Sequence, residues 1–241
     1  EDISLPLEEG VYPFLYAACC DEVGLVPMKK HVGIDPTAAR SAFELNSNNK
    51  PFNAMLDSGA LVCSSLYRYS ASPSDKFRSL QRDIELLAGG RRTSFSQADY
   101  IRKKAEAYDI QAIAHFLQSE NALDTTVDCD MVVDFLLQSQ CILVNTEVAS
   151  AIAATLAKGG KSPRDGRRAL SKDAVRATLT IMLGAGMDYN SGRWASNIGE
   201  PAKCTSNGLI STVLSGKFGL ALYCPRAPDG SNFMPYTYGF F

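Results

Sequence analysis

The sequence predicts an α+β fold in which most helices come first and most strands come last. Between about residues 11 and 185, apolar side chains recur mainly at helical spacing, and short polar or glycine-rich segments separate the periods. After about residue 193 the apolar segments shorten and alternate with turn residues, as in strands and hairpins. The 46% apolar content is enough for a large core in 241 residues. We therefore predict a single domain over residues 1–241, with a helical part at about 11–185 and late strands at about 193–241.

Four helical segments are predicted in the first half of the chain. Pro27 is expected to break the first of them, Ser72 to cap the third, and the pair Gly89–Gly90 to end the third. A polar, Asn-rich loop is expected between the first and the second. The predicted helical ranges are 11–33, 57–69, 76–88 and 96–119.

The second half predicts three further helices and then strands. The helices cover about 129–140, 146–158 and 172–184, and Ser171 opens the last of them. The segments WASNIGEPAK and LISTVLSGKFGLALYCPRAP, together with the final aromatic stretch, are interpreted as short strands and turns.

Charge and cysteine content exclude several classes of function. The 24 basic and 26 acidic residues nearly cancel, so no nucleic-acid partner is expected. No apolar run reaches the ~18 residues that a membrane-spanning helix needs. The seven cysteines form no C-x-x-C pair and only two histidines are present, so we expect no metal site and no cofactor. The cysteines are expected to be reduced and buried.

Two long stretches carry a family resemblance. KPFNAMLDSGALVCSSL, residues 50–66, resembles the segment KPxNPMxNAGAIxxxSL of the glutaminase family, and residues 148–203 resemble a second family segment that ends in VGxPAK. The resemblance implies the fold of serine β-lactamases and penicillin-binding proteins, a mixed sheet flanked by helices with a helical subdomain. Relative to that pattern, the chain is expected to lack the usual first strands and last helix. The family further implies a mitochondrial or cytoplasmic location.

The motif that carries catalysis in the family has changed. Glutaminases are expected to hydrolyse L-glutamine with a serine nucleophile and a lysine base in an S-x-x-K-P motif. This motif aligns with EGVYP, so the resemblance places Glu9 at the nucleophile position and Tyr12 at the base position. Removing either group typically costs many orders of magnitude in rate. A second S-x-x-K, residues 47–50, lies in the Asn-rich loop, where a plain turn is the stronger expectation.

Positions that surround the substrate in the family also carry different residues here. The resemblance assigns them to a remnant substrate pocket, whose members are Asp57, Lys103, Ile110, Leu136, Asp188 and Ser206. Lys103 replaces a glutamate and would repel the α-amino group of glutamine. Asp57 replaces an asparagine and is either a site residue or a helix N-cap. If the alignment is correct, Asp57 and Lys103 lie close enough to pair or to share a water.

These changes lead to three functional hypotheses. The first is a non-catalytic glutaminase homologue, a pseudoenzyme that serves as a structural or assembly subunit of a larger complex. The second is a module that binds a small ligand or pigment in the remnant pocket, which Ile110 and Leu136 make less polar. The third is an L-glutamine amidohydrolase with residual activity.

The late strand predicts a protein partner. Residues 218–223 are rich in apolar side chains, which suits a central strand covered on both faces. In the family's fold the first strand pairs with this one, and without it a row of backbone groups has no partner. We therefore expect another polypeptide along that edge, which is a cleaved N-terminal piece, a second copy of this chain or a different subunit.

Overall fold

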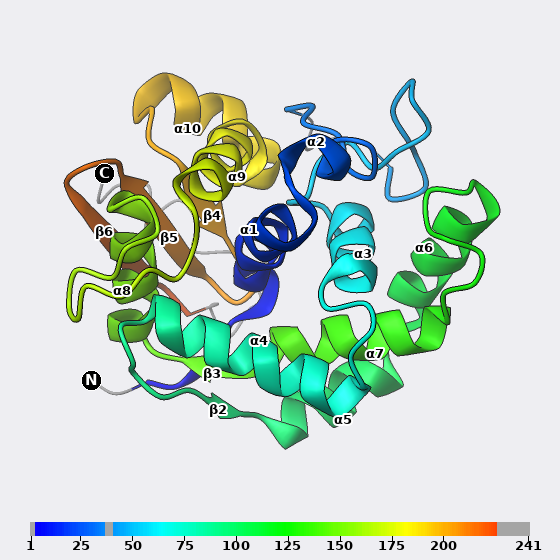
Figure 1. Cartoon of the computed structure of the whole chain (residues 1–241), viewed down its shortest axis with the longest axis horizontal. Coiled ribbons are helices and arrows are strands. Elements are labelled where there is room, and N and C mark those ends of the chain that lie inside the picture. The colour runs from blue at the N-terminus through cyan, green and yellow to red at the C-terminus, as the bar shows by residue number, and fades with distance from the viewer. Residues whose placement is uncertain (1–2, 37–40, 226–241) are drawn as a thin grey trace.

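The computed structural model describes residues 3–36 and 41–225, which form helices and two small sheets (Figure 1). The helices of this part are η1 (Glu8–Val11), α1 (Tyr12–Val23), α2 (Leu25–Met28), α3 (Asp57–Leu66), α4 (Pro73–Leu87), α5 (Gln97–Ala105), α6 (Tyr108–Ser119), α7 (Cys129–Gln140), α8 (Thr146–Ala157), α9 (Lys172–Ala185), η2 (Asp188–Asn190) and α10 (Ser191–Asn197), where η marks a 3₁₀ helix. The strands are β1 (Leu5–Pro6), β2 (Ser94–Phe95), β3 (Ile142–Val144), β4 (Ala202–Cys204), β5 (Leu209–Leu214) and β6 (Phe218–Tyr223).

Both sheets are antiparallel. The first has the order β1–β3–β2, so it joins segments that are far apart in sequence, with Leu5 opposite Val144. The second is the meander β4–β5–β6, in which Ile210 lies opposite Leu222. The short first sheet matters for function because it fixes the start of η1 and α1, where the candidate site lies.

Helices cover both sheets and enclose a common core. α8 packs across β5 and β6, while α1 runs through the middle of the molecule between α3 and α9 (Figure 1). The approach of α8 to β6 depends on Gly219, because a Cβ at this position would lie 2.1 Å from the backbone nitrogen of Ala154. A second apolar cluster forms around Trp194, which α10 packs against β4 and β5.

Several predicted elements are confirmed at nearly their predicted bounds. α7 begins and ends as predicted, α3 begins at Asp57, and α4 begins after the Ser72 cap, whose hydroxyl accepts from the amide of Asp75. Gly89 and Gly90 have φ of 67° and 82° and follow the end of α4, as the predicted stop requires.

Other boundaries differ from the prediction. The first helix ends at Gly24, whose φ of 93° breaks it three residues before Pro27. The predicted helix at 96–119 is two helices, with the break at residues 106 and 107. Residues 191–197 form α10 instead of a strand, so the late strands begin at Ala202. The helix places the side chain of Trp194 in the interior, where it is 1% exposed. The final aromatic stretch lies outside the described residues.

None of the helices in the described ranges is both long and apolar enough to cross a bilayer.

Candidate functional site

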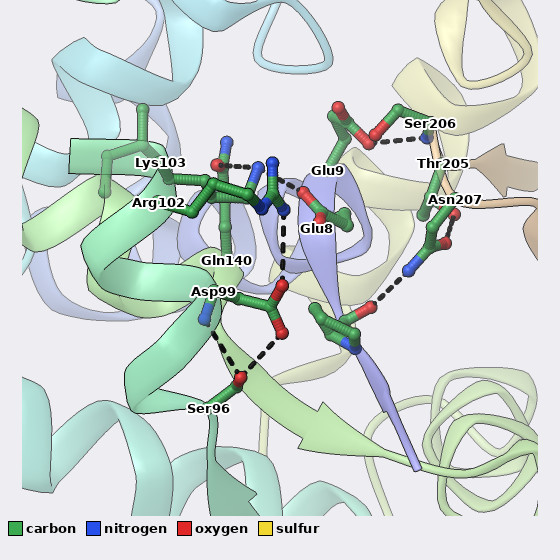
Figure 2. A network of polar contacts seen from close by, with 12 residues as sticks. Glu8, Glu9, Ser96, Asp99, Arg102, Lys103, Gln140, Thr205, Ser206 and Asn207 are labelled. Carbon is green, nitrogen blue, oxygen red and sulfur yellow. Dashed lines mark hydrogen bonds and ion pairs between the residues drawn. The ribbon is translucent and has the colours of Figure 1, made fainter. Parts of the chain in front are cut away.

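The candidate site surrounds the start of α1, where the two sheets and several helices meet. β1 leads into η1, and the two glutamates of η1 point to different sides (Figure 2). Glu8 faces α5, whereas Glu9 faces the turn between β4 and β5. Glu8 has a φ of 51°, a left-handed conformation that is unfavourable for a residue with a side chain and that the packing around it must hold.

Glu9 is bound by the β4–β5 turn. Its Oε2 accepts a hydrogen bond from the backbone nitrogen of Ser206 at 2.8 Å. The turn is itself fixed, because the hydroxyl of Thr205 donates to Oδ1 of Asn207 and Nδ2 of Asn207 donates to the carbonyl of Pro6 (Figure 2). A half-buried carboxylate is thus held in place beside a backbone amide. The structure places Glu9 and Ser206 together, as the resemblance predicts for the two sides of one site.

Tyr12 and Asp57 form a short hydrogen bond that is buried at Tyr12 and open to solvent at Asp57. The hydroxyl of Tyr12 donates to Oδ1 of Asp57 at 2.5 Å and accepts from Nε2 of Gln140 at 2.9 Å. Burial raises the pKa of the Asp57 carboxyl; the Tyr12 hydroxyl and the Lys203 ammonium oppose that rise, and the carboxylates of Glu9 and Asp188 add to it. Burial also raises the pKa of Tyr12, so its phenol stays neutral and acts as a proton donor.

This geometry decides the role of Asp57. The residue is the first of α3 and its side chain makes no N-cap hydrogen bond, since the cap position is Leu56. Its carboxyl instead accepts the hydrogen bond from the Tyr12 hydroxyl. Asp57 is therefore a residue of the candidate site.

Lys103 also lies in this network, but its partner is Glu8. Its Nζ is 2.5 Å from Oε2 of Glu8 and donates to Oε1 of Gln140 at 3.2 Å (Figure 2). Burial raises the pKa of Glu8, and the Lys103 charge lowers it again in part. Asp57 and Lys103 do not pair directly as expected. They are connected through Tyr12 and Gln140, because Gln140 has both a donor and an acceptor and spans the gap between them.

The side of the site formed by β4 contains a buried cation. Lys203 is 2% exposed, and its Nζ donates to the carbonyl of Cys204 at 2.7 Å and lies 3.4 Å from Oδ1 of Asp188. Burial lowers the pKa of Lys203, but the acidic groups of Cys204, Asp188 and Glu9 outweigh burial and raise it overall. Asp188 also accepts from Sγ of Cys204 at 3.2 Å and has a φ of 48°. Lys203 is thus a permanent positive charge between the carboxylates of the site.

Three sequence-derived candidates lie apart from this network. Leu136 is fully buried in the main core, and Ile110 packs against the same core. Neither side chain has a polar group to contribute. The second S-x-x-K forms a turn in which Nζ of Lys50 donates to the carbonyl of Lys29 at 3.2 Å, so its lysine is used for loop structure.

Sequence reasoning missed three residues of the network: Glu8, Gln140 and Lys203. Lys203 lies in PAK, a motif that the resemblance matches, and a lysine within a short apolar strand is itself a signal of a buried charge. Glu8 and Gln140 had no comparable signal, because β1 and the end of α7 are brought together only by the tertiary fold. Within the described ranges, no group of three or more His, Cys, Asp or Glu residues is arranged to hold a metal ion.

Comparison with known proteins identifies the family. The family model described as Glutaminase matches residues 2–232. The mitochondrial liver isoform of glutaminase from Rattus norvegicus is 32% identical over 220 residues, which are 91% of this chain and 36% of that protein. A glutaminase from Corynebacterium glutamicum is 30% identical and aligns with 96% of this chain and 56% of its own length. The chain belongs to the glutaminase family.

The fold comparison agrees. A crystal structure of Mglu in its native form superimposes with a TM-score of 0.90 at 27% identity, over 99% of this chain and 58% of that one. The predicted glutaminase-type fold is therefore confirmed. The chain spans about a third of the rat relative and a little over half of the Corynebacterium relative and of Mglu.

The expectation of a pseudoenzyme is contradicted. The relatives that align with nine-tenths or more of the chain are named glutaminases, which are enzymes, and none of these matches indicates a structural or assembly role. That expectation rested on the combined changes at the nucleophile position, the base position and the substrate pocket. The changed side chains are real, but loss of the family's motif does not by itself exclude hydrolysis by other groups of the same site.

Proposed function

We propose that this chain is an L-glutamine amidohydrolase, with its site between Glu9, Tyr12, Asp57 and Lys203. The observation that carries the proposal is the match to the glutaminase family over nearly the whole chain. The dense polar network at the start of α1 supports it, because strained and buried polar groups concentrate at functional sites.

The chemistry must differ from that of a Ser-Lys pair. We infer that the carboxylate of Glu9, oriented by the amide of Ser206, takes a proton from a water molecule. The water oxygen then attacks the side-chain carbonyl carbon of glutamine, and the C–N bond breaks to release ammonia. The positive charge of Lys203, which lies between the carboxylates of the site, stabilises the negative charge that develops on the carbonyl oxygen. Glu9 then returns the proton that it took from water to the leaving nitrogen, while Asp57 stays the acceptor of the Tyr12 hydroxyl.

This mechanism implies a slow enzyme. General base catalysis contributes roughly 10²–10⁴-fold. A covalent serine route would add a second, independent gain, and Glu9 and Tyr12 do not provide the hydroxyl and amine for it. Turnover is therefore expected well below that of a glutaminase with the full motif.

Ammonia release from L-glutamine tests the proposal. The wild-type protein is expected to release ammonia and glutamate in equal amounts, faster than from L-asparagine, and Glu9→Gln is expected to lose the activity. Glu147→Gln is the matched control, because Glu147 is exposed and its carboxylate, as far as the described residues go, pairs with Arg91 alone. Equal rates for the wild type and Glu9→Gln would contradict the role of Glu9, and the absence of any ammonia release would contradict the function.

We further propose that another polypeptide segment covers the outer edge of β6. Among the described strands, β6 pairs with β5 alone. The strand is only partly buried, with Phe218 51% exposed, and an open edge of this kind presents unpaired backbone groups to which another strand can add. Native mass spectrometry is expected to find a second copy or a separate chain. A stable monomer whose outer β6 amides exchange freely with solvent would contradict this proposal.

A further inference from the structure

A cavity lies away from the candidate site, between the end of α3 and the beginnings of α4 and α7. Its volume is about 310 Å³, and its lining is mainly apolar, with Tyr69, Met131, Val132 and Phe135 among its members. Tyr69 and Met131 are 83% and 52% exposed, which is high for large apolar side chains at a cavity rim. The cavity thus offers an apolar surface that the protein itself leaves uncovered.

The side-chain amine of Lys76 lies in the lining of this mainly apolar cavity. Nζ of Lys76 donates to the carbonyl of Ser64 at 2.5 Å and lies 4.6 Å from the centre of the Phe135 ring. Within the described residues, Lys76 forms no ion pair with a carboxylate. Burial lowers the pKa of Lys76 to about 8. The ammonium is therefore desolvated without a counter-ion, which is an unfavourable state for a charge.

The acidic groups near Lys76 interact with other partners. Glu22 on α1 pairs with Arg68, and Cys19 on the same helix donates its thiol hydrogen to a backbone carbonyl. Asp128 lines the cavity, but its carboxylate accepts from the amides of the first turn of α7 as the N-cap. Cys19 and Glu22 oppose the effect of burial on the pKa of Lys76, but burial outweighs them.

We propose that this cavity binds a small amphipathic monocarboxylate, with its apolar body against Met131, Val132 and Phe135 and its carboxylate on Lys76. The ligand would supply the missing counter-ion and cover exposed apolar surface in one step. A neutral ligand would leave the ammonium unpaired, and a dianion would be repelled by Asp128. The site is independent of the hydrolytic site proposed above.

The pH dependence of binding follows from the same contact. A carboxylate beside Lys76 favours the charged amine, so the pKa of Lys76 rises on binding. By linkage, affinity is highest while the free protein is protonated and falls as pH rises above about 8.

Calorimetric titration with 3-phenylpropionate and its neutral amide tests the proposal. The wild type is expected to bind the carboxylate at least tenfold more tightly than the amide at pH 7, and this preference is expected to weaken between pH 8 and pH 10. Lys76→Met is expected to bind both equally, while Lys172→Met, at an exposed lysine of α9, keeps the preference.

Three results would overturn the proposal: no binding of 3-phenylpropionate to the wild type, equal binding of the two compounds, or an unchanged preference in Lys76→Met. If Lys76→Met does not fold, the wild-type pH series decides alone, because a preference that does not change above pH 8 is incompatible with Lys76 as the partner.

Discussion

Replacing Tyr12 by Phe removes one hydroxyl from the buried network and keeps the ring that fills the core. Asp57 loses a 2.5 Å charge-assisted bond, and Nε2 of Gln140 loses its acceptor. A hydrogen bond to a charged group contributes about 1.5–3 kcal/mol, and an unsatisfied buried donor costs about 1–3 kcal/mol. Because Asp57 is open to solvent and can bond water in place of the hydroxyl, we expect a total loss in the lower part of the combined range, about 2.5–4 kcal/mol, in the free energy of unfolding at pH 7.

The effect of this substitution should depend on pH. The pKa of Asp57 in the folded state is already raised above its value in the unfolded chain, and the Tyr12 hydroxyl limits that rise. Without the hydroxyl the pKa rises further, so ionised Asp57 is more destabilising above that pKa and the penalty is relieved as pH falls through it. The loss measured for Tyr12→Phe is therefore expected to be larger at neutral pH than in acid.

Urea unfolding followed by the fluorescence of the single tryptophan, Trp194, measures this loss. Tyr67→Phe is the matched control, because the Tyr67 hydroxyl also donates to an aspartate, but Asp83 keeps the Arg68 guanidinium at 3.5 Å when that hydrogen bond is lost. The control is expected to lose less and to show little change with pH. A loss for Tyr12→Phe below that of Tyr67→Phe, or one that grows on acidification, would refute the reasoning.

Two further substitutions test the packing and the charge network by the same unfolding assay. Gly219→Ala forces a Cβ to within 2.1 Å of the backbone nitrogen of Ala154, so we expect the free energy of unfolding to fall by at least about 1–3 kcal/mol. The control Gly192→Ala, with no atom within 4 Å of the added Cβ, is expected to be neutral or slightly stabilising. Equal effects would contradict the close contact of β6 and α8. Lys103→Met leaves the Glu8 carboxylate buried without its cation, so we expect the free energy of unfolding to fall by about 3–5 kcal/mol at neutral pH and by less in acid. Adding Glu8→Gln to the same chain is expected to restore much of this stability. An additive double mutant would show that the two side chains do not interact.

The sequence predicted the helices whose signals are local. Ser72, Asp128, Asn145 and Ser171 each cap a helix by accepting from a backbone amide, and an N-cap acts within its own first turn, so neighbouring residues suffice to locate the start. The resemblance predicted the fold for a different reason, because it matched long segments whose order in the chain fixes the topology.

The errors came from contacts that no local pattern encodes. α10 looked like part of a strand region, but Trp194 is 1% exposed and donates from its ring nitrogen to the carbonyl of Glu200, so tertiary packing decided its conformation. Lys103 was expected to pair with Asp57, yet it pairs with Glu8, since the bend at η1 turns that side chain toward α5. Side-chain partners within the site thus depended on backbone turns that the sequence did not reveal.

The most direct test concerns the proposed hydrolysis of L-glutamine by this glutaminase family member and its requirement for Glu9. L-Glutamine with an isotopic label on the side-chain nitrogen, incubated with the purified protein and followed by nitrogen NMR, measures the cleaved bond directly. We predict that the wild type and Glu147→Gln release labelled ammonium. Glu9→Gln is expected to lower the rate of release at least a hundredfold, as expected for loss of a general base. Labelled glutamine that stays intact with the wild type, or is cleaved equally by Glu9→Gln, would contradict this proposal.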